Sequence, residues 1–247
     1  MSEDKRVAIV GQPPLAIIRQ LEAEQAEIID LDMPMPGVRL DEAALCLPKV
    51  YCAILRAVAA NAVCLRPRRI YIDVGRGKCD GAAHLATILR HALPECAVIA
   101  CENRDAKDFS TPRCLTEMPL ADKMQAICAS VVSSAAHPLF PACHPTVGFW
   151  GVPPRDFSLL TLFPDTTHVF GWARCLENKT PDNDRLEALF DPEIPTVFFA
   201  QSFCAKSALA RHLASLHRRA LAVDSDEAVG SSGRAKIQAF LELNGVL

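Results

Sequence analysis

The sequence lacks the features that would place it in a membrane or on nucleic acid. No apolar run approaches the roughly 18 residues that a membrane helix needs, and no apolar secretory segment follows the charged start at residues 1–6. Acidic residues number 29 against 26 basic ones, and neither sign gathers into blocks, which argues against electrostatic binding of nucleic acid. We therefore expect a cytoplasmic protein with no membrane and no nucleic-acid partner.

Several catalytic and metal-binding motifs are also missing. There is no CxxC pair, no HExxH helix, no nucleophile elbow and no Gly-Lys-Ser/Thr nucleotide loop. The glycine-rich residues 75–81 follow an expected strand, but their spacing matches neither phosphate-binding fingerprint. Arg76 and Lys78 in this stretch therefore fit a solvated loop better than phosphate ligands.

Cysteine, by contrast, is abundant. The chain has 11 cysteines, an odd number, and without a secretory signal we expect them to be reduced. Each is then a buried apolar filler, a metal ligand or a nucleophile. Packing accounts best for the cysteines set among aliphatic residues, namely Cys64, Cys96, Cys101, Cys114 and Cys128.

The order of apolar runs predicts an α/β fold. Strands are expected at residues 6–10, 26–31, 69–74 and 98–101, and helices at residues 15–24, 41–62, 82–91 and 120–136. Strands that alternate with helices of this length form parallel βαβ units with right-handed crossovers.

An internal repeat indicates two such units in tandem. Residues 7–14 recur at residues 147–154 with four identities, and in each half a later strand leads into a cysteine that opens a helix, Cys79 and Cys204. We predict two Rossmann-like lobes with parallel sheets, an N-terminal α/β lobe at 1–136 and a C-terminal α/β lobe at 137–247. The junction is expected in the Pro/His-rich stretch that opens the second lobe.

The repeated cysteines define a candidate metal site. Ligands of parallel α/β sheets lie beyond the carboxyl ends of the strands, and a helix N-terminus favours a thiolate. Cys79 and Cys204 have this position in the two lobes, and either Cys52 or Cys46 supplies a third thiol from the first lobe. Three thiolates suit an iron–sulfur cluster with one open coordination position.

These residues resemble a known family. The similarity lies in Cys52-Ala53-Ile54-Leu55-Arg56, in Cys79-Asp80-Gly81 after a strand, in Phe203-Cys204, and in the tail at 222–226 and 237–242. Together they look like a short member of the 2-hydroxyacyl-CoA dehydratase and benzoyl-CoA reductase family, which includes the double-cubane-cluster proteins.

The resemblance implies a 4Fe-4S cluster held between two lobes by three cysteines. It also implies a related subunit as partner, in a hetero- or homodimer, and a separate ATP-dependent activator as electron donor. The second lobe is compressed between residues 174 and 195, and residues 233–236 replace a basic threonine-rich pattern. Both departures weaken what the resemblance implies about an acyl-CoA substrate more than what it implies about the cluster.

The sequence thus predicts an iron–sulfur subunit of a low-potential reductase or dehydratase, an oxidoreductase or a lyase of anaerobic metabolism. The alternative is a non-catalytic scaffold or electron-relay subunit of a larger redox complex. A third interpretation is a binding protein for a small phosphate-bearing ligand in which every thiol is structural. Cys143 and Cys175, near the lobe junction, are open candidates for a second metal site.

Overall fold

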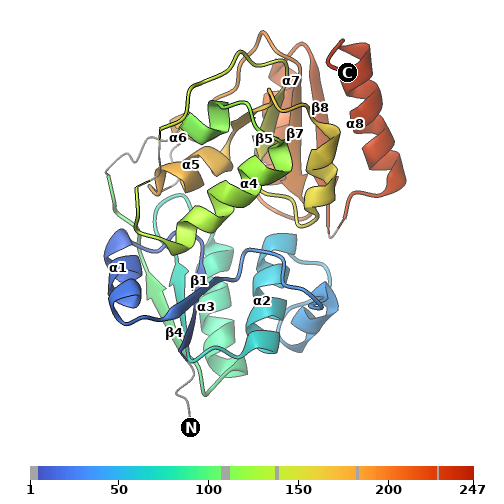
Figure 1. Ribbon diagram of the computed structural model, residues 1–247. Helices are drawn as coiled ribbons and strands as arrows, with labels where there is room; N and C mark the ends of the chain where they lie inside the picture. The colour runs from blue at the N-terminus through green and yellow to red at the C-terminus, as the bar shows by residue number, and fades with distance from the viewer. Residues whose placement is uncertain (1–4, 107–111, 137–138, 182–183, 227) are drawn as a thin grey trace.

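The computed structural model describes residues 5–106, 112–136, 139–181, 184–226 and 228–247. It contains two four-stranded sheets, each entirely parallel and flanked by helices (Figure 1). The elements up to the end of the first sheet are β1 (Arg6–Val10), α1 (Leu15–Ala23), β2 (Glu27–Asp30), the 3₁₀ helix η1 (Leu40–Leu45), α2 (Ala53–Leu65), β3 (Arg69–Asp73), α3 (Asp80–Ala92) and β4 (Ala97–Cys101).

The rest of the chain builds the second sheet and its cover. Its elements are η2 (Pro112–Leu115), α4 (Leu120–Ala129), η3 (Ser130–Val132), β5 (Gly148–Gly151), η4 (Phe157–Leu162), β6 (His168–Phe170), α5 (Trp172–Asn178), α6 (Asp184–Glu187), β7 (Thr196–Gln201), α7 (Lys206–Leu216), β8 (Ala220–Ser225) and α8 (Ser231–Leu243).

The two sheets share one topology, as the internal repeat predicted. Their strand orders are β2-β1-β3-β4 and β6-β5-β7-β8, so β5 takes the place of β1 and β7 the place of β3. The first strand of each set lies between the second and third, and connections therefore leave it in opposite directions. This reversal is the point at which doubly wound sheets bind ligands.

The central strands form around apolar runs, residues 70–72 in β3 and residues 197–200 in β7. All six residues of β7 are buried, and four of the five residues of β3 are buried. Such uninterrupted runs are typical of parallel strands covered on both faces. The covering helices are amphipathic: α3 buries Ala82, Leu85, Ala86 and Leu89, which share one helix face.

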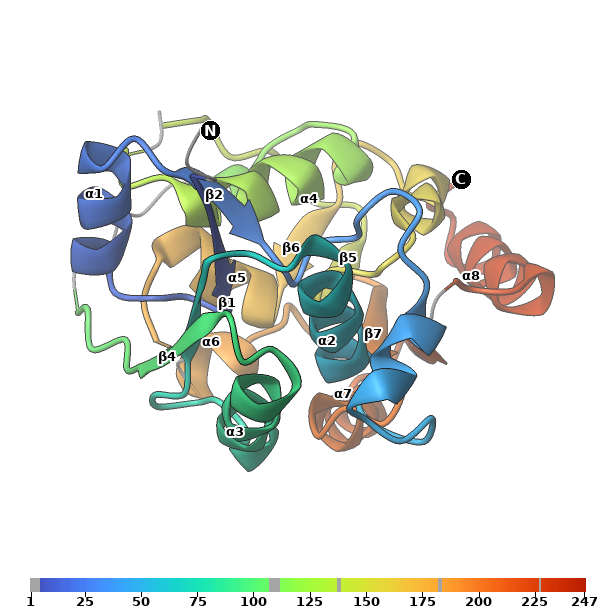
Figure 2. The same ribbon diagram turned by 90° about the horizontal axis from the view of Figure 1, so that it is seen from below.

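Figure 2 shows α1 on one side of the first sheet and α2 and α3 on the other. The alternation of strand residues matches this arrangement. Ile9 faces α1, where it packs with Ile18, whereas Ala8 packs with residues of α2 and α3. The Ile9 face belongs to one apolar cluster that continues into the second sheet through Phe149 and Phe199. The two lobes therefore share a core.

Two expected helices are shorter than predicted. The single helix expected over 41–62 is instead η1 and α2, with residues 46–52 outside any helix. Pro48 explains the break, because proline disfavours helical backbone in the residue before it and donates no hydrogen bond. The helix expected over 120–136 ends at Ala129, where the Ser130 hydroxyl donates to the carbonyl of Ile127 (2.6 Å).

The division at residue 136 stays a prediction. Residues 137 and 138 lie outside the described residues. However, α4 precedes this division and packs on η4 and α5, in the layer that covers the second sheet (Figure 1). Met124 of α4 lies in the same buried cluster as Phe149 and Leu160.

The aromatic core of the second lobe offers a test of the packing. Phe149 is fully buried, with ring centroids 5.5 Å from Phe163 and 5.9 Å from Phe199. We expect Phe149→Ala to lower the free energy of unfolding by about 3–5 kcal/mol, because the void cannot close fully. Urea denaturation measures the change. Leu243→Ala, at a side chain that is 87% exposed, is the control and should change it by less than about 0.5 kcal/mol.

Candidate functional site

A cavity of about 370 Å³ lies between the lobes at the carboxyl ends of their strands. Its walls come from the ends of β1 and β3 and from the segments that follow β2, β5, β6 and β7. The lining is mainly apolar, with a few polar groups. The residues are Val10, Gly11, Asp32, Cys52, Ile54, Leu55, Asp73, Gly77, Lys78, Cys79, Ala82, Val152, Trp172, Glu187, Cys204, Ala205, Lys206 and Leu209.

Three of the four cysteines singled out from the sequence line this cavity. Cys52 is the residue that precedes the first turn of α2, and Cys79 has the same place before α3. Cys204 lies two residues before α7. The cavity therefore receives three thiols from three helix N-termini, two from the first lobe and one from the second.

Cys52 has a thiol whose surroundings favour the thiolate. The Cys204 thiol donates a hydrogen bond to the Cys52 sulfur, and this contact does most to lower the pKa of Cys52, to about 7. Burial opposes the effect, and the backbone N–H groups of Ile54 and Leu55 add to it. Free amides at a helix start stabilise a thiolate in this way.

Cys204 is the complementary partner. Donation to Cys52 and burial both raise the pKa of Cys204, against a smaller opposite effect from the backbone N–H of Lys206. The preceding residue, Phe203, adopts a left-handed backbone (φ 57°) and is 62% exposed. The reversal of chain direction after β7 thus turns the Cys204 side chain inward and leaves Phe203 outside.

Cys79 is exposed and follows the loop after β3. Gly81, in the first turn of α3, makes its position possible. A Cβ at residue 81 would lie 2.6 Å from Leu55 Cδ1 and 3.3 Å from Cys79 Sγ. The absence of a side chain therefore allows the start of α3 to approach α2 and brings Cys79 to the same cavity as Cys52.

Cys46, the alternative third thiol, does not line the cavity. It ends η1 and packs at the edge of the cluster formed by α2, α3 and the first sheet. Burial raises the pKa of Cys46. The structure thus brings Cys52, and not Cys46, beside Cys79 and Cys204.

Two lysines and a tryptophan form the polar end of the cavity. Lys78 Nζ lies 5.1 Å from the centre of the Trp172 ring, and Lys206 Nζ lies 5.8 Å from it. Lys206 is paired with Glu187, and Lys78 Nζ lies 3.6 Å from Asp73 Oδ2. Both ammonium groups are therefore fixed by a carboxylate and an aromatic face. Arg76, the other basic residue of the glycine-rich stretch, is exposed and does not line the cavity.

The carboxylates of the first lobe are held by backbone amides. Asp73 Oδ1 accepts from the N–H groups of Gly75 (3.0 Å) and Asn103 (3.1 Å). Asp32 Oδ2 accepts from Gly11 N–H (2.6 Å). Burial raises the pKa of Asp32 and that of its neighbour Asp30.

The lobes are joined beside the thiols. Ala53 N–H, next to Cys52, donates to the carbonyl of Ser202 (3.0 Å) in the segment that leads to Cys204. One turn further along α2, Arg56 Nη1 contacts both oxygens of Asp226 at 3.1 and 3.3 Å. These two links fix the start of α2 against the second lobe.

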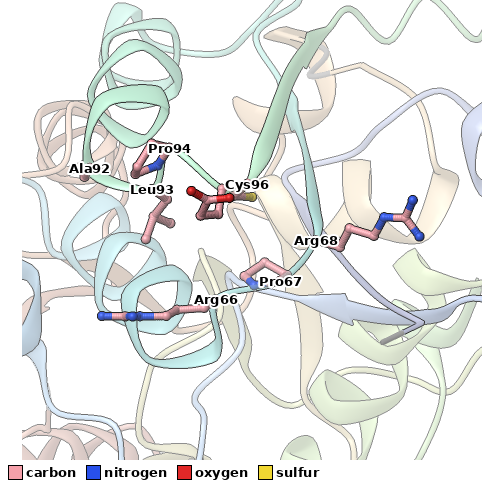
Figure 3. A pocket seen from close by; sticks show the side chains of 8 residues that line it. Arg66, Pro67, Arg68, Ala92, Leu93, Pro94 and Cys96 are labelled. Carbon is pink, nitrogen blue, oxygen red and sulfur yellow. The ribbon is translucent and has the colours of Figure 1, made fainter. Parts of the chain in front are cut away.

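Other hollows and thiols do not form a comparable site. A hollow of about 520 Å³ lies at the amino ends of β3 and β4, between Arg66, Arg68, Pro94 and Cys96 (Figure 3). Its one lining thiol belongs to Cys96, whose pKa burial raises to about 11. This edge of the sheet presents strand starts, not helix N-termini.

The candidates for a second metal site lie apart from this cavity. Cys143 Sγ is 3.7 Å from His168 Nε2, which also lies 3.0 Å from the Cys143 carbonyl oxygen, and Cys175 is fully buried. Across the residues that the structure describes, no group of three or more His, Cys, Asp or Glu side chains is tight enough to hold a single metal ion. Nor does any helix in the described part of the chain have the length and apolar character needed to cross a bilayer.

The geometry defines a class: a two-lobed, doubly wound α/β protein with a thiol-lined cavity between its lobes. No protein-family model matches the chain, and no curated protein is significantly similar to it.

The hydrogen bond between Cys204 and Cys52 leads to a pH-dependent prediction. Alkylation of Cys52 by iodoacetamide should have its half-maximal rate near pH 7, because the thiolate is the reactive form and the pKa of Cys52 is about 7 against an ordinary 9.0. Cys204→Ala should move this midpoint upward, and Cys204→Ser, which keeps a donor, should move it less. Peptide mass spectrometry measures the rates; an unchanged midpoint in Cys204→Ala would contradict the assignment.

Proposed function

We propose that this chain is the iron–sulfur subunit of a low-potential reductase or dehydratase, with a 4Fe-4S cluster held by Cys52, Cys79 and Cys204. One observation carries the proposal: these three thiols, contributed by both lobes, line a single cavity at the topological switch points of the two sheets.

The donor set fits such a cluster. Thiolates are the ligands that iron–sulfur clusters take, and each of these three cysteines lies at or near a helix start. A single ion needs its ligands in one tight shell, whereas cluster thiolates bind separate irons around a wider body. Because no such tight shell occurs among the described residues, the three thiols support a cluster better than a mononuclear centre.

When bound, a cluster with three protein ligands supplies a low-potential electron and one open iron position that can polarise a substrate oxygen. The chain's own residues prepare the cavity for this chemistry. Ile54, Leu55 and Val152 form apolar walls, beside which polar contacts are stronger than in water. Lys78 and Lys206, each held against Trp172, present ammonium donors to an oxygen atom of the substrate.

The cavity favours a catalytic role over that of a scaffold or electron relay. An electron relay needs a short path to its electron donor and acceptor. It does not need a cavity in which ammonium groups are held in place to bind a substrate. The family resemblance adds a related subunit and an ATP-dependent activator as the proposed partners. The reducing cytoplasm expected from the sequence is the setting in which the thiols stay available.

Reconstitution under anaerobic conditions tests the proposal. Incubation of the reduced chain with ferrous iron and sulfide should yield about four iron and four sulfide per chain. Cys52→Ser, Cys79→Ser and Cys204→Ser should each reduce both contents to a small fraction, because the hydroxyl is a poor ligand. Cys46→Ser and Cys96→Ser are matched controls and should retain them.

A triple serine variant at positions 52, 79 and 204 that keeps its full iron and sulfide content would overturn the site. Circular dichroism of the same samples distinguishes loss of the ligands from loss of the fold. Turnover of a candidate acyl-CoA with an ATP-dependent activator then separates a catalytic subunit from a relay.

A further inference from the structure

We propose that Cys52 and Cys204 form a reversible disulfide when the cavity holds no cluster, which makes the pair a thiol-oxidation site that joins the two lobes. The bond itself depends only on the contact between the two side chains. Its effect on cluster assembly rests on the proposed function.

The two sulfur atoms are neighbours without any metal to gather them. Both side chains line the same cavity, and a contact between the two thiols is the main cause of the lowered pKa of Cys52 and the raised pKa of Cys204. The backbone on either side is fixed, because Ala53 N–H donates to the Ser202 carbonyl (3.0 Å). The ion pair of Arg56 with Asp226 holds the next turn of α2 against the second lobe. These links hold the two segments that carry the thiols side by side.

The pair is also reachable. Both residues line the cavity between the lobes, and Cys79 at its wall is exposed to solvent. A small disulfide that enters the cavity therefore meets the Cys52 sulfur, with the Cys204 sulfur beside it.

The oxidant in this step is a low-molecular-weight disulfide. The Cys52 thiolate attacks one of its sulfur atoms, so that a mixed disulfide forms and one small thiolate leaves. Cys204 then loses its proton to solvent and attacks the Cys52 sulfur, which releases the second small thiol. Two protein thiols are oxidised to one disulfide, and the reagent is reduced to two thiols.

The disulfide would control whether a cluster can assemble in the cavity. The disulfide removes two of the three proposed ligands at once and leaves Cys79 alone, so iron and sulfide cannot assemble there. A dithiol reductant reverses the bond by the same exchange and restores the ligand set.

Mass spectrometry of the full-length, metal-free chain tests the inference. The reduced protein is treated with hydroxyethyl disulfide, alkylated with iodoacetamide and digested. We expect a linked pair of peptides that contain Cys52 and Cys204, a loss of two hydrogens from the intact mass, and an alkylated Cys79. Cys46→Ser should form the same bridge, whereas Cys52→Ser and Cys204→Ser should not.

A stable hydroxyethyl adduct on Cys52 with Cys204 still alkylated would overturn the inference, as would a bridge that contains Cys79. Reconstitution of the bridged chain, with and without prior reduction by dithiothreitol, separates the two proposals. If reduced chain takes up iron but no bridge forms, the oxidation site is wrong and the cluster proposal stands. If the bridge forms but reduced chain takes up no iron, the cluster proposal is wrong and the oxidation site stands.

Discussion

The close contact between the start of α2 and the segment after β7 is the constraint on which the rest of the cavity depends. A single backbone hydrogen bond, from Ala53 to Ser202 (3.0 Å), joins the two lobes at the point where their thiols face each other. The Cys204–Cys52 hydrogen bond, the lowered pKa of Cys52 and the closed wall of the cavity all follow from this approach. Parallel strand topology makes the approach possible, because it sends every helix N-terminus to the same edge of its sheet.

Much of this architecture could be predicted from the sequence because buried parallel strands are locally distinctive. The centres of β3 and β7 are apolar runs, and the strand-end rule alone predicts that the cysteines that follow them lie at one edge of the sheets. The choice between Cys46 and Cys52 could not be made in that way. It depended on where α2 begins, and the apolar pattern continues through the break that Pro48 imposes.

The polar end of the cavity was harder to predict, for a different reason. The sequence pattern favoured a solvated loop for Lys78, and this was wrong, because its side chain is mostly buried and lines the cavity. Asp73 is the last residue of β3, and Trp172 follows β6 after one glycine, so the strand-end rule that found the cysteines applies equally to both. Glu187 does not lie at the end of a strand, so the strand-end rule does not point to it. It lies in the short helix α6, within the compressed part of the second lobe. Its partnership with Lys206 arises from tertiary packing alone.

The continuous core has a consequence for how ligands enter. Ile9 and Tyr71 of the first sheet belong to the same buried cluster as Phe149 and Phe199 of the second. A hinge motion that moves the lobes apart would have to separate this shared core. It would expose apolar surface to water at a cost of about 25 cal/mol for every Å². Hinge opening of the two lobes is therefore unfavourable, and the exposed lining residue Cys79 marks a side from which solvent reaches the cavity without it.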